Sequence, residues 1–409
     1  FNQFARKSYF YPDLPKGYQI SQYEYPLAIN GWLEIDLPDG STKRIGIKRA
    51  HLEEDTGKLT HVNAHSLVDL NRAGVPLLEI VSEPDIRSAE EAEAYARKLR
   101  AVLRYLGVNS GDMSKGVLRM EPNISVRPVG SSEFRTRTEV KNLNSIRSLA
   151  RATAFEIERQ IAVYESGGEV QQATMGWDEQ RQATVTQRIK ESAEDYRYFP
   201  EPDLPVLEIE RAWVDAVRAR LPELPDAKRD RLIETLGLSR YDASVLVAER
   251  AVAEYYEAAL AAGGDPKGVA NYITGDVFRV MNNDSRERET IDSIKLTPQA
   301  LAELVSLVQA GTINHGTAKK LLETVYAEGG SPAQLVEERG LAQVSDEDVL
   351  RQAVIAALDD HPDETARFLA GEEKVIKFLM GMVMRAMKGK ADAQVVQRLL
   401  ADELNARRG

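Results

Sequence analysis

The sequence predicts an α+β protein, with a mixed, largely antiparallel-sheet cradle domain followed by an all-helical domain and a helical C-terminal tail domain. Runs of alternating hydrophobic and polar residues, typical of strands with one solvated face, fill the first half of the chain. Helical periodicity then takes over. A second break precedes Thr297 and Pro298, which have the order of an N-cap and a first helical residue. We therefore place the domains at residues 1–210, 211–293 and 294–409.

A hairpin and one hydrophobic run are the simplest strand predictions. Residues 32–37 and 43–49 alternate in character, and Pro-Asp-Gly at 38–40 separates them with a turn signal. Residues 75–81 form a hydrophobic run of strand length that a single acid, Glu79, interrupts. The hairpin leads directly into the most acidic short segment of this region.

Serine caps predict two helices in the same domain. A capping box begins at Ser88, with Glu91 three positions later, and the helical pattern runs toward Gly107. Ser145 caps a second helix, which we expect to end near Gly167.

Two further segments, residues 117–127 and 134–141, are predicted to be strands with one charged face each. Pro122 places the first strand at a sheet edge or a bulge, because proline cannot donate a ladder hydrogen bond. The two faces together indicate a binding floor, whereas the alternative is the ordinary wet face of an antiparallel sheet. The polar positions are Arg119, Glu121, Asn123, Ser125 and Arg127 in the first strand, and Arg135, Arg137, Glu139 and Lys141 in the second.

Composition limits the classes of function. The chain has 409 residues, a formal net charge of −11 and no cysteine. An acidic chain contacts nucleic acid through local basic patches rather than over its whole surface. The lack of cysteine excludes disulfides, thiolate zinc sites and a cysteine nucleophile within this chain, and it fits a reducing cytoplasm. No membrane span or signal peptide pattern is present, and the start at Phe1 without an initiator Met suggests a fragment.

Residues 51–58 concentrate three carboxylates, an imidazole and an ammonium group. On an extended backbone His51, Glu53 and Asp55 share one face, whereas Glu54 points to the other. Mg²⁺ takes one or two carboxylates directly and fills its octahedron with waters and substrate phosphates. Two or three acids from separate strands would therefore hold it, although a solvated acidic turn is the alternative.

Glu79 is the second acid of interest, because a carboxylate among hydrophobic neighbours is costly unless it is paired or bound to a metal. The alternative is that it faces solvent from a half-exposed strand. His51, His61 and His65 lack thiolate neighbours, so we expect ordinary exposed histidines rather than a zinc site. The sequence contains no P-loop, nucleophile elbow or kinase glycine loop.

Basic charge gathers at the C-terminal end. Residues 374–409 carry eight Lys or Arg and three Asp or Glu, a balance of 8 − 3 = +5 in an otherwise acidic chain. Such a patch suits contact with a phosphate backbone, and a solvated helix face is the alternative. The candidate nucleic-acid contacts are Lys374, Lys377, Arg385, Lys388 and Lys390.

Several of these segments together resemble the B subunit of the glutamine-dependent aspartyl/glutamyl-tRNA amidotransferase. The segments occur in the family's order, and the likeness covers essentially the whole chain. The matching segments are residues 51–58, 66–72, 76–85, 141–145 and 195–203, followed by 384–390 in the tail.

The resemblance implies ATP-dependent phosphorylation of the side-chain carboxylate of misacylated Glu-tRNA(Gln) or Asp-tRNA(Asn), followed by attack of ammonia to give Gln-tRNA(Gln) or Asn-tRNA(Asn). ATP and Mg²⁺ are the implied cofactors. The resemblance also implies that Glu54 and Glu79 hold Mg²⁺ and that the basic tail contacts the tRNA. The candidate catalytic acids are Glu53, Glu54, Glu79 and Glu121, and our candidates for phosphate contact, from charge and strand face, are Arg119, Lys141 and Arg197.

The implied partners are the amidase (A) subunit, a small (C) subunit and the misacylated tRNA, and the amidase subunit donates the ammonia. A non-discriminating aminoacyl-tRNA synthetase is a further candidate partner. Two departures from the family are visible: a Gly-Leu-Glu-Val-His strand that opens the family lies upstream of this sequence, and Glu121 stands where relatives commonly have Asp. A non-catalytic tRNA-binding scaffold is the alternative function. It is disfavoured because carboxylates facing phosphates repel them.

Overall fold

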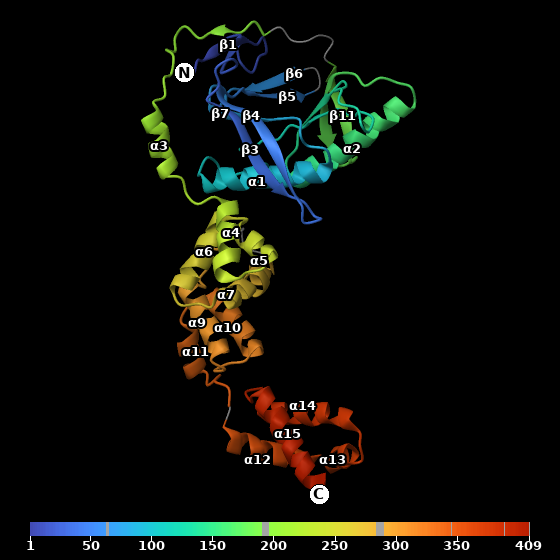
Figure 1. Ribbon diagram of the computed structural model, residues 1–409, viewed down its shortest axis with the longest axis vertical. Coiled ribbons are helices and arrows are strands. Elements are labelled where there is room, and N and C mark those ends of the chain that lie inside the picture. Colours follow the sequence, from blue (N-terminus) through green and yellow to red (C-terminus); the bar gives the residue numbers. More distant parts are fainter. Residues whose placement is uncertain (63–64, 190–195, 284–289, 345, 388, 409) are drawn as a thin grey trace. The chain divides into compact units, whose positions relative to one another are not determined.

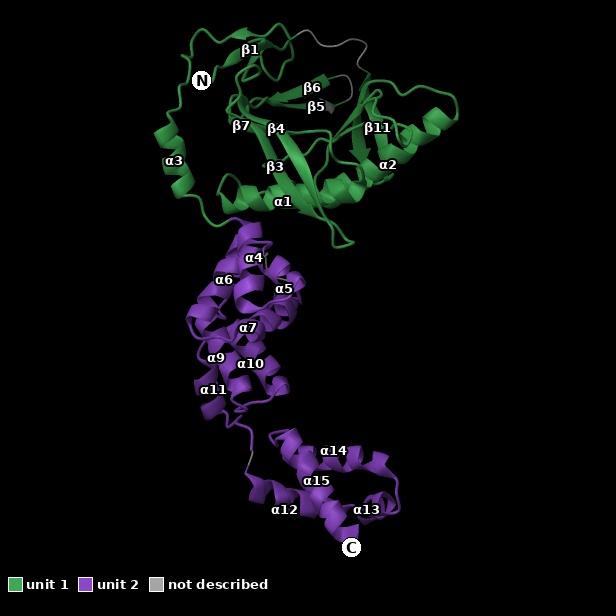
Figure 2. Ribbon diagram, viewed as in Figure 1, with its two compact units in different colours: residues 1–223 green, residues 224–409 purple. Residues whose placement is uncertain are grey.

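The computed structural model shows two compact units, residues 1–223 and 224–409, which are described separately (Figures 1 and 2). The structure describes residues 1–62, 65–189, 196–283, 290–344, 346–387 and 389–408. Strands occur mainly in the first unit and helices dominate the second, so the predicted α+β class is confirmed.

The central sheet of the first unit confirms the predicted hairpin. Its antiparallel strand order is β3-β4-β7, and the register pairs His51 of β4 with Glu79 of β7. A turn at residues 37–41 joins the first two strands, where Gly40 takes a left-handed φ of 83°. The strands are β3 (Ala28–Asp36), β4 (Thr42–Glu54) and β7 (Pro76–Ser82).

A second sheet has the order β11-β10-β9-β8, and only its β9–β10 pair is parallel. Helix α2 (Ile146–Glu165) packs on one face of this sheet, where Phe155 contacts the Trp177 ring. The other face is not covered by α2. The strands are β8 (Asn123–Ile124), β9 (Thr138–Lys141), β10 (Ala173–Asp178) and β11 (Ala183–Ile189).

Two smaller sheets complete the first unit. The aromatic segment after residue 195 supplies β12, which pairs with β1 as an extended strand, as its prolines suggested. The strands are β1 (Ala5–Ser8), β2 (Tyr18–Ser21) and β12 (Phe199–Pro200) in one sheet, and β5 (Lys58–Val62) and β6 (His65–Asp69) in the other.

The predicted helices of the first unit begin at the predicted caps. The Ser88 hydroxyl accepts the backbone N–H of Glu91 at the start of α1 (Ala89–Tyr105), and the Ser145 hydroxyl accepts that of Ser148 at the start of α2. Both caps satisfy N–H groups that have no partner within the helix. A third helix of this unit, α3, spans Arg211–Ala219.

The prediction of a long strand over residues 117–127 is wrong. Only Asn123 and Ile124 pair in a ladder, opposite Glu139 and Thr138. Residues 134–141 are likewise a strand only from Thr138 onward. Residues 117–127 alternate in character although most of them do not pair with another strand. The hydrophobic residues of this segment pack in the core, whereas polar residues such as Arg119 contact charged partners.

A buried polar network fixes α2 to the second sheet. Glu156 is fully buried and accepts hydrogen bonds from Thr138 of β9 at 2.6 Å and from Thr184 of β11 at 2.9 Å. Arg159 donates to the same carboxylate at 2.6 Å. Gln160 donates to Glu156 and to the backbone oxygen of Ile124. Burial alone would raise the pKa of Glu156, but these hydrogen bonds outweigh burial and lower it.

Replacing Glu156 with glutamine is expected to reduce the free energy of unfolding of this unit by about 2 kcal/mol near neutral pH, because a buried charged acceptor is lost. The lowered pKa means that the stabilisation is present above the ordinary value of 4.5 and is lost as pH falls through the folded value. Urea unfolding followed by tryptophan fluorescence measures this unit alone, since the three tryptophans are Trp32, Trp177 and Trp213. A wild-type advantage that persists unchanged well below pH 4.5 would contradict this account.

The second unit is helical and contains two separate hydrophobic cores. Leu246, Tyr256 and Leu301 belong to one core, and Leu358, Leu379 and Leu400 belong to the other. Thr297 caps the helix that begins with Pro298, as predicted. The elements around the first core are α4 (Pro225–Leu236), α5 (Arg240–Val247), α6 (Arg250–Ala261), α7 (Pro266–Tyr272), the π-helix η1 (Ile273–Val277), α8 (Phe278–Asn283), α9 (Pro298–Gln309), α10 (His315–Glu328) and α11 (Pro332–Glu338).

The elements around the second core are α12 (Glu347–Asp360), α13 (Pro362–Leu369), the 3-10 helix η2 (Glu373–Val375), α14 (Ile376–Ala386) and α15 (Ala393–Arg408). Among the described residues, every helix is too short or too polar to span a bilayer.

Candidate active site

The central sheet gathers His51, Glu53 and Glu79 into one group of possible metal ligands. His51 and Glu53 lie two residues apart on β4, so both point to one face, and Glu79 lies opposite His51 on β7. The His51 Nε2 atom is 3.7 Å from Glu53 Oε2 and 3.4 Å from Glu79 Oε2. One ligand atom from each residue lies within 4.8 Å of the others.

The His51 imidazole and the Glu79 carboxylate favour each other's charged form. Burial disfavours the charged form of His51, but its hydrogen bonds to Glu53 and Glu79 outweigh burial and raise the imidazole pKa. The hydrogen bond from His51 in turn lowers the pKa of Glu79. The expectation that His51 is an ordinary exposed histidine is wrong, because its side chain is only 3% exposed. Glu79 keeps a half-exposed side chain, so the group is open to a ligand from one side.

Aromatic and polar side chains surround the three ligands. Tyr198 stacks on Tyr23 with ring centroids 4.4 Å apart, and burial raises the pKa of Tyr198 to about 12. The Arg49 guanidinium lies 5.2 Å from the Tyr23 ring centroid. Within the described part of the chain, buried nitrogen atoms of Gln22, Arg49 and His51 have no hydrogen-bond partner. Buried polar atoms without partners are rare, and their presence beside potential ligands favours a binding site.

Glu54 lies outside this group. Lys16 Nζ is 2.5 Å from Glu54 Oε1, and the backbone N–H of Ile20 donates to the same oxygen at 2.8 Å. Strand alternation, which was predicted, explains why Glu53 and Glu54 have different neighbours. Glu54 and Glu79 as a pair of Mg²⁺ ligands stay a prediction.

Asp55 connects the end of β4 to the segment that carries two further predicted residues. Its carboxylate is 2.6 Å from the guanidinium of Arg119 and 3.1 Å from that of Arg72. Arg119 precedes Glu121 by two residues, so this ion pair anchors the stretch of chain that carries Glu121.

Lys141 and Glu121, which were predicted on two separate strands, meet in the structure. Lys141 Nζ is 3.1 Å from Glu121 and 3.6 Å from Glu139. Burial would lower the pKa of Lys141, but the two carboxylates raise it, so the ammonium group stays charged. The last candidate for phosphate contact, Arg197, is exposed just before β12 with a left-handed φ of 45°.

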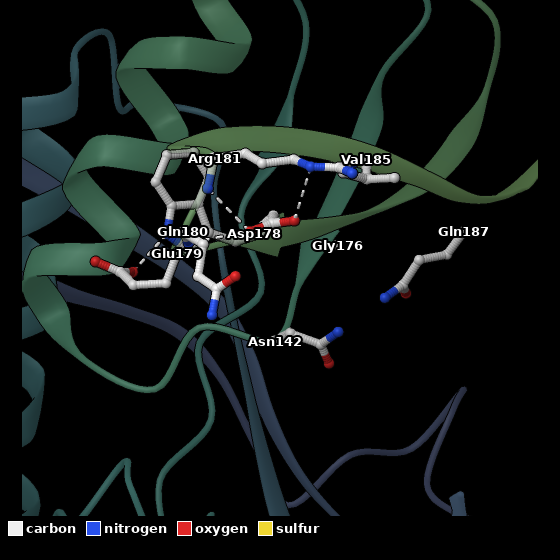
Figure 3. Close-up of a pocket in the computed structure, with 9 residues that line it drawn as sticks. Asn142, Gly176, Asp178, Glu179, Gln180, Arg181, Val185 and Gln187 are labelled. Carbon is white, nitrogen blue, oxygen red and sulfur yellow. Dashed lines mark hydrogen bonds and ion pairs between the residues drawn. The ribbon is translucent and has the colours of Figure 1, made fainter. Parts of the chain in front are cut away.

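A cavity of about 420 Å³ opens on the second sheet (Figure 3). None of the predicted site residues lines it, although its Asn142 directly follows Lys141. Sequence reasoning missed this place because it left residues 169–189 without predicted strands, although residues 183–189 alternate. The lining residues are Asn142, Gly176, Trp177, Asp178, Glu179, Gln180, Arg181, Val185 and Gln187.

The structure separates two kinds of basic residue in the tail. Lys374, Lys377, Arg385 and Lys390 have no ion pair with any residue that the structure describes, and the first three are exposed. By contrast, Arg407 is 2.7 Å from Asp359. The predicted candidate Lys388 lies outside the described residues.

Comparison with known proteins supports a catalytic first unit. Residues 1–215 match the family model described as the GatB/GatE catalytic domain, and residues 254–404 match a GatB domain. Curated relatives are named as the B subunit of aspartyl/glutamyl-tRNA(Asn/Gln) amidotransferase. The relative from Herpetosiphon aurantiacus is 51% identical over 99% of this chain and 84% of its own length. Those from Moorella thermoacetica and Thermodesulfovibrio yellowstonii are 51% and 49% identical, over 99% and 98% of this chain and 85% and 84% of theirs.

A catalytic domain with an acidic ligand group, joined to helical domains, defines one chain of a ligase rather than a simple RNA-binding scaffold. The chain belongs to the B-subunit family of the aspartyl/glutamyl-tRNA(Asn/Gln) amidotransferases, which convert misacylated tRNA to Gln-tRNA or Asn-tRNA in protein biosynthesis. The predicted family and reaction class are therefore confirmed. The family name also implies a complex of several subunits that acts on tRNA.

Proposed function

We propose that the first unit phosphorylates the side-chain carboxylate of the glutamyl or aspartyl group on misacylated tRNA, with ATP as phosphate donor and Mg²⁺ as cofactor. The observation that carries this proposal is the group of His51, Glu53 and Glu79 on the central sheet. A carboxylate reacts poorly with ammonia because its oxygen is a poor leaving group, and phosphorylation supplies a good one. Phosphoryl transfer depends on positioning and on cations around the phosphate more than on covalent chemistry by the protein.

The donor set fits a divalent cation. Two carboxylates, Glu53 and Glu79, are as many as Mg²⁺ commonly takes from a protein, and the half-exposed side of Glu79 leaves room for water and phosphate. His51 contributes either a ligand or a hydrogen bond that orients the carboxylates. Glu54 is one residue away and joins the set if Lys16 releases it. The bound cation would neutralise charge on the phosphates.

The basic residues complete the proposed site. Lys141 sits between Glu121 and Glu139, and it turns toward the nucleotide phosphates when they bind. Arg119 is oriented by Asp55, and its remaining N–H groups suit phosphate oxygens. Arg197 approaches from the segment before β12. Glu121 then keeps Lys141 charged and oriented.

The proposed partners follow from the reaction. This sequence contains no cysteine and no serine nucleophile motif, which supports the amidase (A) subunit as the source of ammonia, with a small (C) subunit in the same complex. The basic tail binds the tRNA, and a non-discriminating aminoacyl-tRNA synthetase supplies the misacylated substrate. We propose that this complex acts in the cytoplasm.

The test of the proposed function is phosphate release from ATP by the complete complex. We expect release with Glu-tRNA(Gln) or Asp-tRNA(Asn) and little with the corresponding deacylated tRNA, because the acceptor is the amino-acid side chain. Equal release with deacylated tRNA would show that ATP is not used to activate that side chain.

A further inference from the structure

Strand β4 extends beyond its neighbour β3, and the extension carries the candidate ligands. The last residue of β4 that pairs with β3 is Ala50, so residues 51–54, the ligand segment, have a paired strand, β7, on one side only. On the other side this segment forms hydrogen bonds with four consecutive residues, 19–22, which end β2 and directly follow it. We propose that residues 19–22 position the carboxylates of Glu53 and Glu54 for a divalent cation. This inference rests on the proposed function and deepens it.

Two glutamines hold the backbone of the ligand segment. Gln22 Oε1 accepts the backbone N–H of Leu52 at 3.0 Å, and Gln19 Nε2 donates to the backbone oxygen of Glu54 at 2.8 Å. A neighbouring strand normally bonds such groups through its own backbone. Here side chains bond them instead, on both sides of Glu53, so the backbone that carries this candidate ligand is fixed.

The same four residues hold each carboxylate through one oxygen. Ser21 Oγ donates to Glu53 Oε2 at 3.4 Å, and the backbone N–H of Ile20 donates to Glu54 Oε1 at 2.8 Å. The other oxygen of each carboxylate has no hydrogen bond to a residue that the structure describes. A carboxylate that is oriented through one oxygen keeps the second oxygen available to a cation, and such supporting contacts tune metal sites.

Burial shows that these side chains do more than cover a strand edge. Gln19, Ser21 and Gln22 are only 6%, 3% and 0% exposed. Gln22 Nε2 has no partner among the described residues, which is costly for a buried amide, and a hydrophobic side chain of similar length would avoid that cost. The bond of Gln22 to Leu52 therefore explains the glutamine better than packing does. Edge coverage alone also leaves the contact between Ser21 and the Glu53 carboxylate unexplained.

The positioning residues are themselves held by the small sheet of β1, β2 and β12. Ser21 pairs with Ala5 across β2 and β1, and β1 pairs with β12. The Arg6 guanidinium, from β1, is 2.7 Å from the buried carboxylate of Glu201, which directly follows β12. A rigid support of this kind keeps ligand atoms in place before the cation binds, which is what a preorganised site requires.

Binding of Mn²⁺, a paramagnetic substitute for Mg²⁺, to the complete complex without nucleotide tests the proposal. Electron paramagnetic resonance measures the free Mn²⁺, and the relevant site is the one that Glu79→Ala removes. Ser21→Ala and Gln22→Met are each expected to weaken binding at that site by about tenfold, as is common for contacts that support metal ligands. Ser21→Thr keeps the hydroxyl and should bind Mn²⁺ within about twofold of wild type.

Activity provides a second readout of the same variants. The Mg²⁺ concentration for half-maximal phosphate release should rise by about the same factor as the Mn²⁺ dissociation constant. The KM for Glu-tRNA(Gln) should stay within about twofold of wild type, because residues 19–22 act on the carboxylates and not on the tRNA. A purely structural defect would lower the amount of folded complex without changing either metal constant.

Ser8→Ala is the matched control, because Ser8 lies on β1 of the same sheet and has no hydrogen bond to the ligand segment in the part of the chain described. Wild-type Mn²⁺ affinity in Ser21→Ala would overturn the proposal, and so would an equal loss in Ser8→Ala. Ser21→Ala removes a single oxygen, so it decides the question even if Gln22→Met does not fold. Failure of the proposed function itself appears differently, as a complex whose Mn²⁺ binding Glu79→Ala leaves unchanged.

Discussion

Glu79→Ala is expected to reduce tRNA-dependent phosphate release by about 100-fold or more, because it removes a carboxylate from the proposed cation site. Glu79 is the member of the group that comes from a second strand, so no neighbour on β4 can replace it. Binding of Glu-tRNA(Gln) should change little, since the basic tail is untouched. The measurement is phosphate release and tRNA affinity for the same complex.

Glu34→Ala is the control for this variant, because Glu34 is an exposed acid on β3, the third strand of the same sheet. It should keep wild-type rates. Glu79→Asp should recover part of the activity, since it retains the carboxylate. Near-normal phosphate release by Glu79→Ala would mean that the acid is structural and that the cation, if any, binds elsewhere.

Replacing Lys374, Lys377 and Arg385 together with alanine is expected to weaken tRNA binding on the order of 100-fold at low salt, since three cations are lost at once. These three side chains are exposed and have no ion pair with a described residue, so each is available to a phosphate. The slope of log affinity against log salt concentration should fall by about 2 to 3. Filter binding of Glu-tRNA(Gln) at several salt concentrations measures both quantities.

Arg407→Ala is the matched control in the tail, because Arg407 is already paired with Asp359. Its removal should change the salt dependence much less. A triple variant that loses phosphate release even at saturating tRNA would contradict a binding role for the tail. An unchanged salt slope would show that the tRNA backbone is contacted elsewhere.

Local signals in the sequence predicted much of the first unit. The turn at residues 38–40 and the serine caps at 88 and 145 specify structure over a few residues, and the hairpin and both helices are found where those signals stand. The strand predicted over residues 117–127 failed because a ladder requires a partner strand, and alternation alone does not show one. Strands β9 and β10 pair in parallel. Parallel strands are joined by a long crossover and not by a tight turn, so the sequence contains no turn signal that predicts this pairing.

The sequence predicted which residue types form the candidate site, but it predicted their relative positions less well. Alternation along β4 correctly separated Glu53 from Glu54. The register that sets His51 opposite Glu79 depends on how β4 and β7 align, which no short stretch of sequence encodes. For the same reason the buried position of His51 was missed. The cavity at Gly176 depends on residues of β10 and β11, of the turn between them, and on Asn142 directly after β9, so it became visible only in the folded chain.

The most direct test of the central claim is an isotope-transfer experiment. Glu-tRNA(Gln) is prepared with a heavy oxygen isotope in the side-chain carboxylate and incubated with the complex, ATP, Mg²⁺ and an ammonia source. If the carboxylate is phosphorylated, its oxygen leaves with the phosphate when ammonia attacks, so the released phosphate should carry one labelled oxygen for each Gln-tRNA(Gln) formed. Unlabelled phosphate accompanying normal product formation would contradict activation by phosphorylation.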